Sequence, residues 1–324
     1  MMCTPLFKII KERYPDSHLG FLCYDMGKPI VENNPYLDIV HYIPARGRPT
    51  KEFRLLREIR NENYNYTVSF WNTNRSAIYS LLSGSRTRLS TDRKRQIFYT
   101  KITKNIRNGL PPYSAYDKLK LFDPNLADQN PSLNLYLNLP ISFPMIAFLQ
   151  EKGLNPKRPV VIISPTHRRG ERKWPIKKYS QLADLLVENW NTTVFWAYGP
   201  GEEQVASHGV RLTKGKSFKI PGLDWQELAA FIAQCDLFIG NSNGPSHLAV
   251  AVNTPSIQIH GPTFASAWSP LNSLHQAIEI PAEEKRQTGI ASIATAKVWS
   301  HVQNMKSLVF KKAEKRMGNM EIKH

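Results

Sequence analysis

Residues 238–263 read FIGNSNGPSHLAVAVNTPSIQIHGPT, and this stretch decides the fold. Apolar residues at its two ends predict two buried strands. The small polar residues and Gly244 between them predict a tight loop that leads into a short helix. A buried strand, a loop, a helix and a second buried strand are the unit from which parallel α/β sheets are built.

Phosphate groups are often bound at such a loop. Gly244 lets the backbone come close to a ligand, and the N-terminus of the following helix offers unpaired N–H groups and a favourable dipole. Small polar residues and glycine are also what an ordinary turn requires, with Ser246 as the helix cap. The spacing alone therefore fits both a phosphate site and a plain strand-to-helix turn.

The rest of the chain repeats this alternation, which predicts an α/β fold with two domains. We expect an N-terminal Rossmann-like domain and linker at 1–155, a second Rossmann-like domain at 156–305, and a basic tail at 306–324 that frays. Strands are expected at 18–24, 38–43, 66–71, 160–163 and 192–198, and helices at 4–14, 50–61, 75–82, 176–190, 224–234 and 297–305.

Composition narrows the class of partner. The chain has 324 residues, with 43 Lys and Arg against 26 Asp and Glu, and a formal net charge of +17. This excess implies nucleic acid, phosphorylated metabolites or an acidic membrane surface as partners. Three cysteines without disulfide-type or metal-type spacing indicate a reducing compartment. Neither a signal peptide nor a membrane-spanning run is evident, so we expect a cytoplasmic protein, either free or peripheral on the inner face of the membrane.

The segment from Arg86 to Arg107 is strongly basic, with Asp92 as its one acidic residue. One interpretation is a solvated, partly irregular surface. The other is a docking face for a phosphorylated or membrane-bound substrate.

Several enzyme classes lack their motifs. The segment from Gly209 to Ser217 has one residue too many between its glycines for a Walker A loop. A G-x-G-x-x-G fingerprint, an H-E-x-x-H zinc motif and a G-x-S-x-G elbow are absent, which counts against dehydrogenases, metal hydrolases and serine hydrolases.

A second loop of interest, Ser164-Pro-Thr-His-Arg-Arg-Gly-Glu-Arg-Lys-Trp-Pro175, directly follows a buried strand. Because open α/β sheets bind ligands at the carboxyl ends of their strands, this loop and the 238–263 stretch should lie close together. Arg172 and Lys173 suit a diphosphate, although a cationic loop taken alone is more often a solvated turn.

Motifs in both halves resemble one known family, the lipopolysaccharide heptosyltransferases of glycosyltransferase family 9. The resemblance is carried in the second half by Lys173-Trp-Pro175, Tyr179, Leu182-Ala-Asp184, Tyr198-Gly-Pro-Gly-Glu-Glu203, Gly240-Asn-Ser-Asn-Gly-Pro-Ser-His-Leu-Ala249 and Gly261-Pro-Thr263, and more loosely in the first half by Thr4-Pro-Leu6, Tyr14-Pro-Asp16 and Asn34-Pro-Tyr-Leu-Asp38.

The resemblance implies a GT-B fold, in which two Rossmann-like domains face each other across a cleft. It implies a sugar-nucleotide donor, in this family usually ADP-heptose, on the second domain. The acceptor, a lipid-linked oligosaccharide at the membrane surface, would meet the first. Transfer would be inverting and independent of metal, with basic side chains and helix N-termini stabilising the leaving diphosphate; no cofactor is implied.

By motif match, Arg172 and Lys173 would hold the donor phosphates, and Glu202 or Glu203 would bind the ribose. The remaining residues of the implied donor site are Thr166, Ser242, Asn243, Gly244 and His247, of which His247 fits a packing role equally well.

Two positions depart from the family pattern. Ser242 stands where family members usually carry Asp, and its hydroxyl still donates and accepts hydrogen bonds. The family also begins with a strand and a Gly-Asp loop just before the Thr-Pro helix, and that Asp is its expected base. Here Met1 almost directly precedes the helix, so the first strand and the base are expected to be missing, through a start recorded downstream of the true one or through lost activity. Asp25 is the candidate substitute, or simply a turn residue.

Two alternatives to a transferase stay open. The absent base would suit a non-catalytic relative that binds a sugar nucleotide or a partner without transfer. Nucleic-acid binding rests on charge alone, because no aromatic-basic module such as an RNP sheet motif occurs, and we therefore expect no nucleic-acid partner.

Overall fold

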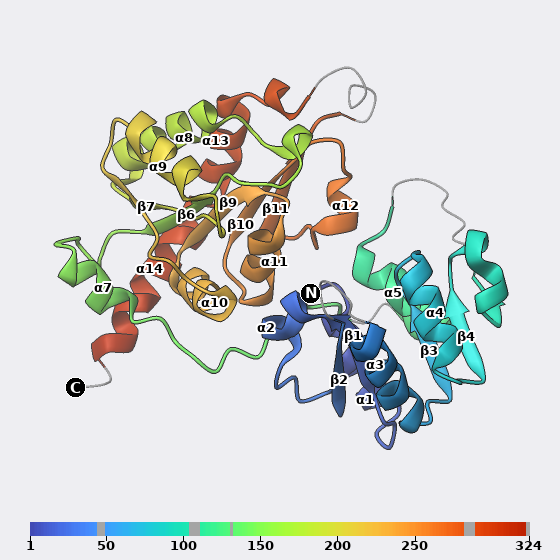
Figure 1. Ribbon diagram of the computed structural model, residues 1–324. Coiled ribbons are helices and arrows are strands. Elements are labelled where there is room, and N and C mark those ends of the chain that lie inside the picture. The colour runs from blue at the N-terminus through green and yellow to red at the C-terminus, as the bar shows by residue number, and fades with distance from the viewer. Residues whose placement is uncertain (44–48, 104–110, 130–131, 282–288, 322–324) are drawn as a thin grey trace. The chain divides into compact units, whose positions relative to one another are not determined.

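A computed structural model describes residues 1–43, 49–103, 111–129, 132–281 and 289–321. The chain divides into two compact units, Met1–Asn138 (unit 1) and Leu139–His324 (unit 2) (Figure 1). Among the described residues, no helix combines the length and apolar character needed to cross a bilayer.

Unit 1 alternates short strands and helices, as the sequence predicts. Its strands form two parallel sheets, β1–β2 and β3–β4–β5, and the described residues show no pairing between β1 and β3. The elements are α1 (Thr4–Arg13), β1 (Gly20–Tyr24), η1 (Asp25–Gly27), α2 (Lys28–Val31), β2 (Ile39–Ile43), α3 (Pro49–Asn61), β3 (Tyr66–Ser69), α4 (Asn74–Leu82), β4 (Thr87–Ser90), η2 (Arg93–Phe98), β5 (Lys101–Ile102), α5 (Ser114–Phe122) and α6 (Pro124–Asp128).

Unit 2 is built on a six-stranded parallel sheet with the strand order β11-β10-β9-β6-β7-β8. Its elements are α7 (Met145–Glu151), β6 (Val160–Ser164), η3 (Gly170–Arg172), α8 (Ile176–Trp190), β7 (Thr193–Trp196), α9 (Glu203–Leu212), β8 (Ser217–Lys219), α10 (Trp225–Gln234), β9 (Leu237–Asn241), α11 (Gly244–Ala251), β10 (Ser256–His260), α12 (Ala265–Trp268), β11 (His275–Glu279), η4 (Ile290–Ser292), α13 (Thr295–Asn304) and α14 (Lys306–Glu321).

The chain runs outward from β6 in both directions, to β7 and β8 on one side and to β9, β10 and β11 on the other. The strand order therefore reverses between β6 and β9, which is the position where open α/β sheets bind ligands. All residues of β6, β7, β9 and β10 are buried, as the apolar runs predict. Helices α8, α9 and α13 lie on one side of the sheet, with α10 and α11 on the other (Figure 1).

The C-terminal segment corrects the sequence-based expectation. Residues 306–324 were expected to fray, but α14 is a helix from Lys306 to Glu321. Its Arg316 is buried and forms an ion pair of 2.5 Å with Asp236, a residue that is fully buried just before β9. Arg316 also donates to the carbonyls of Pro156 and Arg158, next to the start of β6. The helix is thus fastened to the amino edge of the sheet.

The same edge contains a buried histidine. His275 at the start of β11 is hydrogen-bonded through Nδ1 to the Ser256 hydroxyl at 2.9 Å. Burial, and secondarily the charge of Lys312, lowers the pKa of His275 to about 4. Lys312 lies nearby because it donates to the Thr254 hydroxyl at 3.0 Å, next to Ser256.

Unit 2 should therefore lose stability in mild acid. Between pH 6.5 and 4 the unfolded chain binds a proton at His275 and the folded chain does not, so the free energy of unfolding should fall by up to about 3 kcal/mol. His275→Asn keeps a hydrogen-bonding group near Ser256 and should flatten this dependence, measured by urea unfolding across that pH range. The exposed His208→Asn is the control; an equal flattening there would contradict the assignment.

Candidate functional site

The loop after β6 is fastened to the end of β9 by a buried asparagine. The Asn241 side chain donates to the Pro165 carbonyl at 2.7 Å and accepts from the Trp174 N–H at 3.0 Å. Both ends of the cationic loop are therefore held to the neighbouring strand. The sequence-based expectation that the two segments lie together is met at the carboxyl edge of the sheet.

Asn243 also connects these two loops, and it is the N-cap of helix α11. Its Nδ2 donates to the Ser164 hydroxyl at 3.2 Å and to the Thr166 carbonyl at 2.8 Å. Its Oδ1 accepts from the Ser246 N–H, and the Asn243 N–H donates to the Ser246 hydroxyl, so the two residues form a capping box. Because these bonds use both amide hydrogens of Asn243, its side chain positions the loops and has no hydrogen left to donate to a phosphate.

The N-terminus of α11 consequently offers fewer donors than the sequence suggests. The N–H groups of Asn243 and Ser246 are used in the cap, and Pro245 has none. The Gly244 N–H is the first helical donor without a hydrogen-bond partner among the described residues. Any phosphate at this helix would therefore be held by Gly244 together with side-chain cations.

Two glycines in this region permit close approaches. A Cβ on Gly244 would lie 2.6 Å from the indole of Trp225, the first residue of α10, and a Cβ on Gly261 would lie 2.9 Å from the Glu171 carbonyl in η3. Gly261 thus lets the turn after β10 lie against η3. At Gly244 an indole that is 40% exposed occupies the space, so an aromatic surface borders the helix N-terminus.

The positive charge of the loop is concentrated at its C-terminal end. Arg172 is partly buried, and its buried Nε has no hydrogen-bond partner among the described residues. Lys173 beside it is exposed. A buried guanidinium N–H without a partner is costly, so this position is suited to an anionic ligand.

His167 is a further residue of this site, and the motifs did not indicate it. Its Nδ1 accepts from the Arg169 N–H at 3.0 Å, and its ring is hydrogen-bonded to the backbone of Ser242. Burial, followed by the charge of Arg172, holds the pKa of His167 below its usual value. The imidazole is therefore neutral at pH 7 and links the loop after β6 to the loop after β9.

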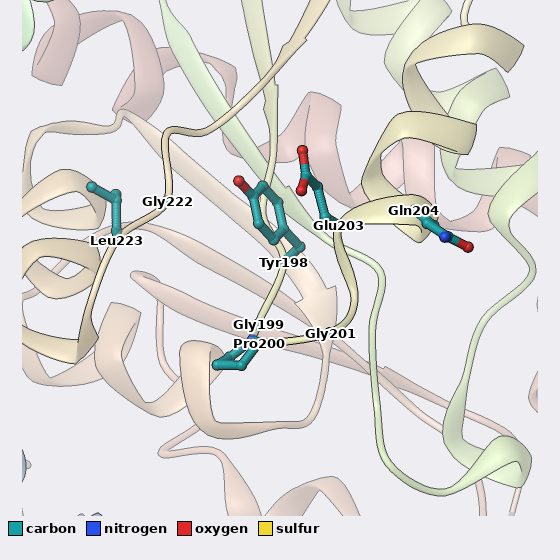
Figure 2. A pocket seen from close by; sticks show the side chains of 8 residues that line it. All are labelled: Tyr198, Gly199, Pro200, Gly201, Glu203, Gln204, Gly222 and Leu223. Carbon is teal, nitrogen blue, oxygen red and sulfur yellow. The ribbon is translucent and has the colours of Figure 1, made fainter.

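A pocket of about 400 Å³ lies at the carboxyl end of β7, the neighbour of β6 (Figure 2). Figure 2 shows Tyr198 and Glu203 beside each other, with Leu223 across from Tyr198. Glu203 forms an ion pair with Lys219, whereas Glu202 turns back to accept from the Gly199 N–H at 3.2 Å. Of the two glutamates the sequence leaves open, Glu203 lines the pocket and Glu202 fixes the turn.

The other proposed residues are placed as follows. Thr166 is buried and its carbonyl accepts from the Asn243 side chain, while Ser242 is half-buried, with its N–H donating to the Ile259 carbonyl. His247 lies 6.1 Å, centroid to centroid, from the ring of Trp268, which is 37% exposed. Asp25 belongs to unit 1, where it is exposed in η1 directly after β1.

Two solved structures show the class of fold. A glycosyl transferase of family 9 from Veillonella parvula DSM 2008 superposes with a TM-score of 0.79 at 17% identity, over 96% of this chain and 93% of that one. The ADP-heptose LPS heptosyltransferase II of E. coli superposes with a TM-score of 0.73 at 17% identity, over 96% and 95%. These likenesses confirm the predicted GT-B fold.

The sequence shows the family. The model of glycosyltransferase family 9 (heptosyltransferase) matches residues 52–296, and the chain belongs to this family. A similar relative is lipopolysaccharide heptosyltransferase 3 of Escherichia coli, which is 25% identical over 287 residues that cover 83% of this chain and 82% of the relative. The resemblance found in the sequence motifs is thereby confirmed.

Proposed function

We propose that this protein transfers a heptose from ADP-heptose to a lipopolysaccharide core or a similar lipid-linked acceptor. The observation that carries the proposal is the position of Arg172 at the strand edge between the pocket after β7 and the N-terminus of α11, where its buried Nε lacks a partner among the residues that the structure describes. Family membership and the donor in the description of the E. coli relative support it.

The donor would be bound in three parts by unit 2. The nucleoside occupies the pocket of Tyr198 and Leu223, and the ribose hydroxyls bind the Glu203 carboxylate. The diphosphate lies at Arg172, Lys173 and the N–H of Gly244. Ser242 and His247 border the sugar side of α11, while Thr166 and Asn243 keep the loops in place.

The proposed reaction is a single displacement. The acceptor hydroxyl attacks the anomeric carbon of the donor, the bond from that carbon to the diphosphate breaks, and ADP leaves with inversion of configuration. Charge grows on the leaving diphosphate, where two cationic side chains and a helix N-terminus stabilise it without a metal. A base must take the hydroxyl proton, and Asp25 in the acceptor-side unit 1 is the candidate. The acceptor places this chemistry at the inner face of the cytoplasmic membrane.

Nucleotide binding tests the donor site. ADP should stabilise the protein in a thermal-shift assay, by about 2.7 kcal/mol at a hundredfold excess over Kd, and UDP should act only weakly. Glu203→Gln should weaken ADP binding at least about tenfold, because a carboxylate bonds ribose hydroxyls more strongly than an amide does. The exposed Glu188→Gln is the matched control.

The results of these assays distinguish the proposed transferase from a misassigned donor site and from a non-catalytic relative. Equal responses to ADP and UDP, or no response to either, would show that the donor site is misassigned. ADP binding without release of ADP from ADP-heptose, with or without acceptor, would favour a non-catalytic relative.

A further inference from the structure

Exposed apolar side chains gather around helix α4 in unit 1. Ile78, Leu81 and Leu82 on the helix are 40–44% exposed, Trp71 just before it is 70% exposed, and Ile97 in η2 is 83% exposed. We call these five residues the α4 surface. Single exposed apolar residues are ordinary, but five on adjoining segments form a patch of the kind that marks an interaction site.

Contacts hold the three segments together. Ile78, Leu81 and Leu82 have the three- and four-residue spacing that places side chains on one face of a helix. Trp71 is held to the first turn of α4, because its carbonyl accepts from the Ser76 hydroxyl at 2.5 Å. Arg95 holds η2 to the same turn by donating to the Asn74 side chain at 2.5 Å.

The surroundings of the α4 surface are cationic. Residues 49–103 contain 11 Lys and Arg but only four acidic residues. Three of these four are already paired: Glu52 with Arg75, Asp92 with Arg95, and Glu62 with His18.

Unpaired cations lie at both ends of the patch. Arg60 donates to the Leu82 carbonyl at 3.4 Å at the C-terminal end of α4. Arg93 and Lys94 are exposed on η2, next to the N-terminal end. Within the part of the chain that the structure describes, these three side chains have no acidic partner.

We propose that the α4 surface docks on an anionic lipid bilayer. The apolar side chains would enter the interfacial layer, where Trp is favoured, and Arg60, Arg93 and Lys94 would contact anionic headgroups. The inference deepens the proposed function and rests on it for its purpose, because a lipid-linked acceptor presents its sugar at such a surface. A second copy of the chain is disfavoured as the occupant, since a two-fold contact over this patch would bring like charges together.

Cosedimentation with vesicles tests the docking surface. The protein should bind vesicles of equal parts phosphatidylglycerol and phosphatidylcholine at low salt, and phosphatidylcholine vesicles far more weakly. The double variant Arg93→Gln/Lys94→Gln should lower the partition coefficient on anionic vesicles at least about tenfold, and Trp71→Ser/Ile97→Ser should lower it by a similar factor. All four side chains are exposed, so the variants should fold normally.

Matched controls come from unit 2. Arg211→Gln/Lys214→Gln removes the same charge from exposed positions, and Ile141→Ser removes an apolar side chain that is 42% exposed. If these controls lose as much binding as the α4 variants, or if the wild type binds neutral vesicles equally well, the proposal is wrong. It is also wrong if sedimentation velocity shows a dimer that Trp71→Ser/Ile97→Ser dissociates.

Thermal shift with ADP tests the donor site of the proposed function independently of the docking surface. The α4 variants should keep the ADP response of the wild type, because no changed side chain lies in unit 2. Vesicle binding that depends on α4 in a protein without an ADP response would support the docking surface and reject the donor site. An ADP response in a protein whose vesicle binding does not depend on α4 would reject the docking surface alone.

Discussion

Arg316→Met should lower the free energy of unfolding of unit 2 by about 3–5 kcal/mol, because removing one partner of a buried ion pair leaves the other charge uncompensated. The remaining carboxylate, that of Asp236, is fully buried, and its only other hydrogen bond within the described residues comes from the Val160 N–H at 2.7 Å. The variant also removes the bonds from Arg316 to the carbonyls of Pro156 and Arg158. Such a loss is a large part of the stability of an ordinary domain.

Urea unfolding followed by tryptophan fluorescence measures this effect in the right unit, because six of the seven tryptophans lie in unit 2. Lys315→Met on the same helix is exposed and removes the same charge, so it should change stability by less than about 0.5 kcal/mol. The double variant Arg316→Met/Asp236→Asn should be more stable than the sum of its single variants predicts. Additive effects would mean that the pair does not interact as the structure indicates.

The failure to foresee α14 has a physical cause. The tail after Lys306 is rich in Lys, and a run of cations in a sequence is normally solvated. Nothing local distinguishes Arg316 from its neighbours, since its counter-charge at Asp236 lies 80 residues earlier. By contrast α8 was foreseen from Ile176 to Trp190, because its amphipathic pattern is a local property of the sequence.

The sequence indicated which loops make up the candidate site, but not the role of each residue in them. A cationic loop after one buried strand and a loop of small polar residues after another were expected at the same edge of the sheet, and the loops after β6 and β9 do lie together there. The pattern could not show that the Asn243 amide is used up in holding the two loops together. Trp225 was missed because its contact with Gly244 is made through space, between residues 19 positions apart. Hydrogen-bond partners and distant ring contacts depend on the tertiary fold, which local sequence patterns do not reveal.

Arg172→Met should lower kcat/KM for heptose transfer by about 10²–10³-fold, because its guanidinium would stabilise the charge that grows on the leaving diphosphate. Arg172→Lys should recover only part of this activity, since an ammonium cannot reproduce the two parallel hydrogen bonds of a guanidinium. Release of ADP from ADP-heptose with a lipid-linked acceptor is the measurement. Arg168→Met, exposed in the same loop, removes the same charge and should change the rate by no more than a few-fold.

The pKa of His167 tests the position of Arg172 independently of its role in heptose transfer. Arg172 helps to hold the pKa of His167 below its usual value, although burial is the larger cause. Arg172→Met should therefore raise the pKa of His167, followed by NMR of the imidazole, whether or not the protein transfers heptose. A raised pKa with undiminished activity would confirm the position of Arg172 and remove it from the proposed mechanism. An unchanged pKa with undiminished activity would contradict both the position and the role, since the charge next to His167 would have been lost without effect.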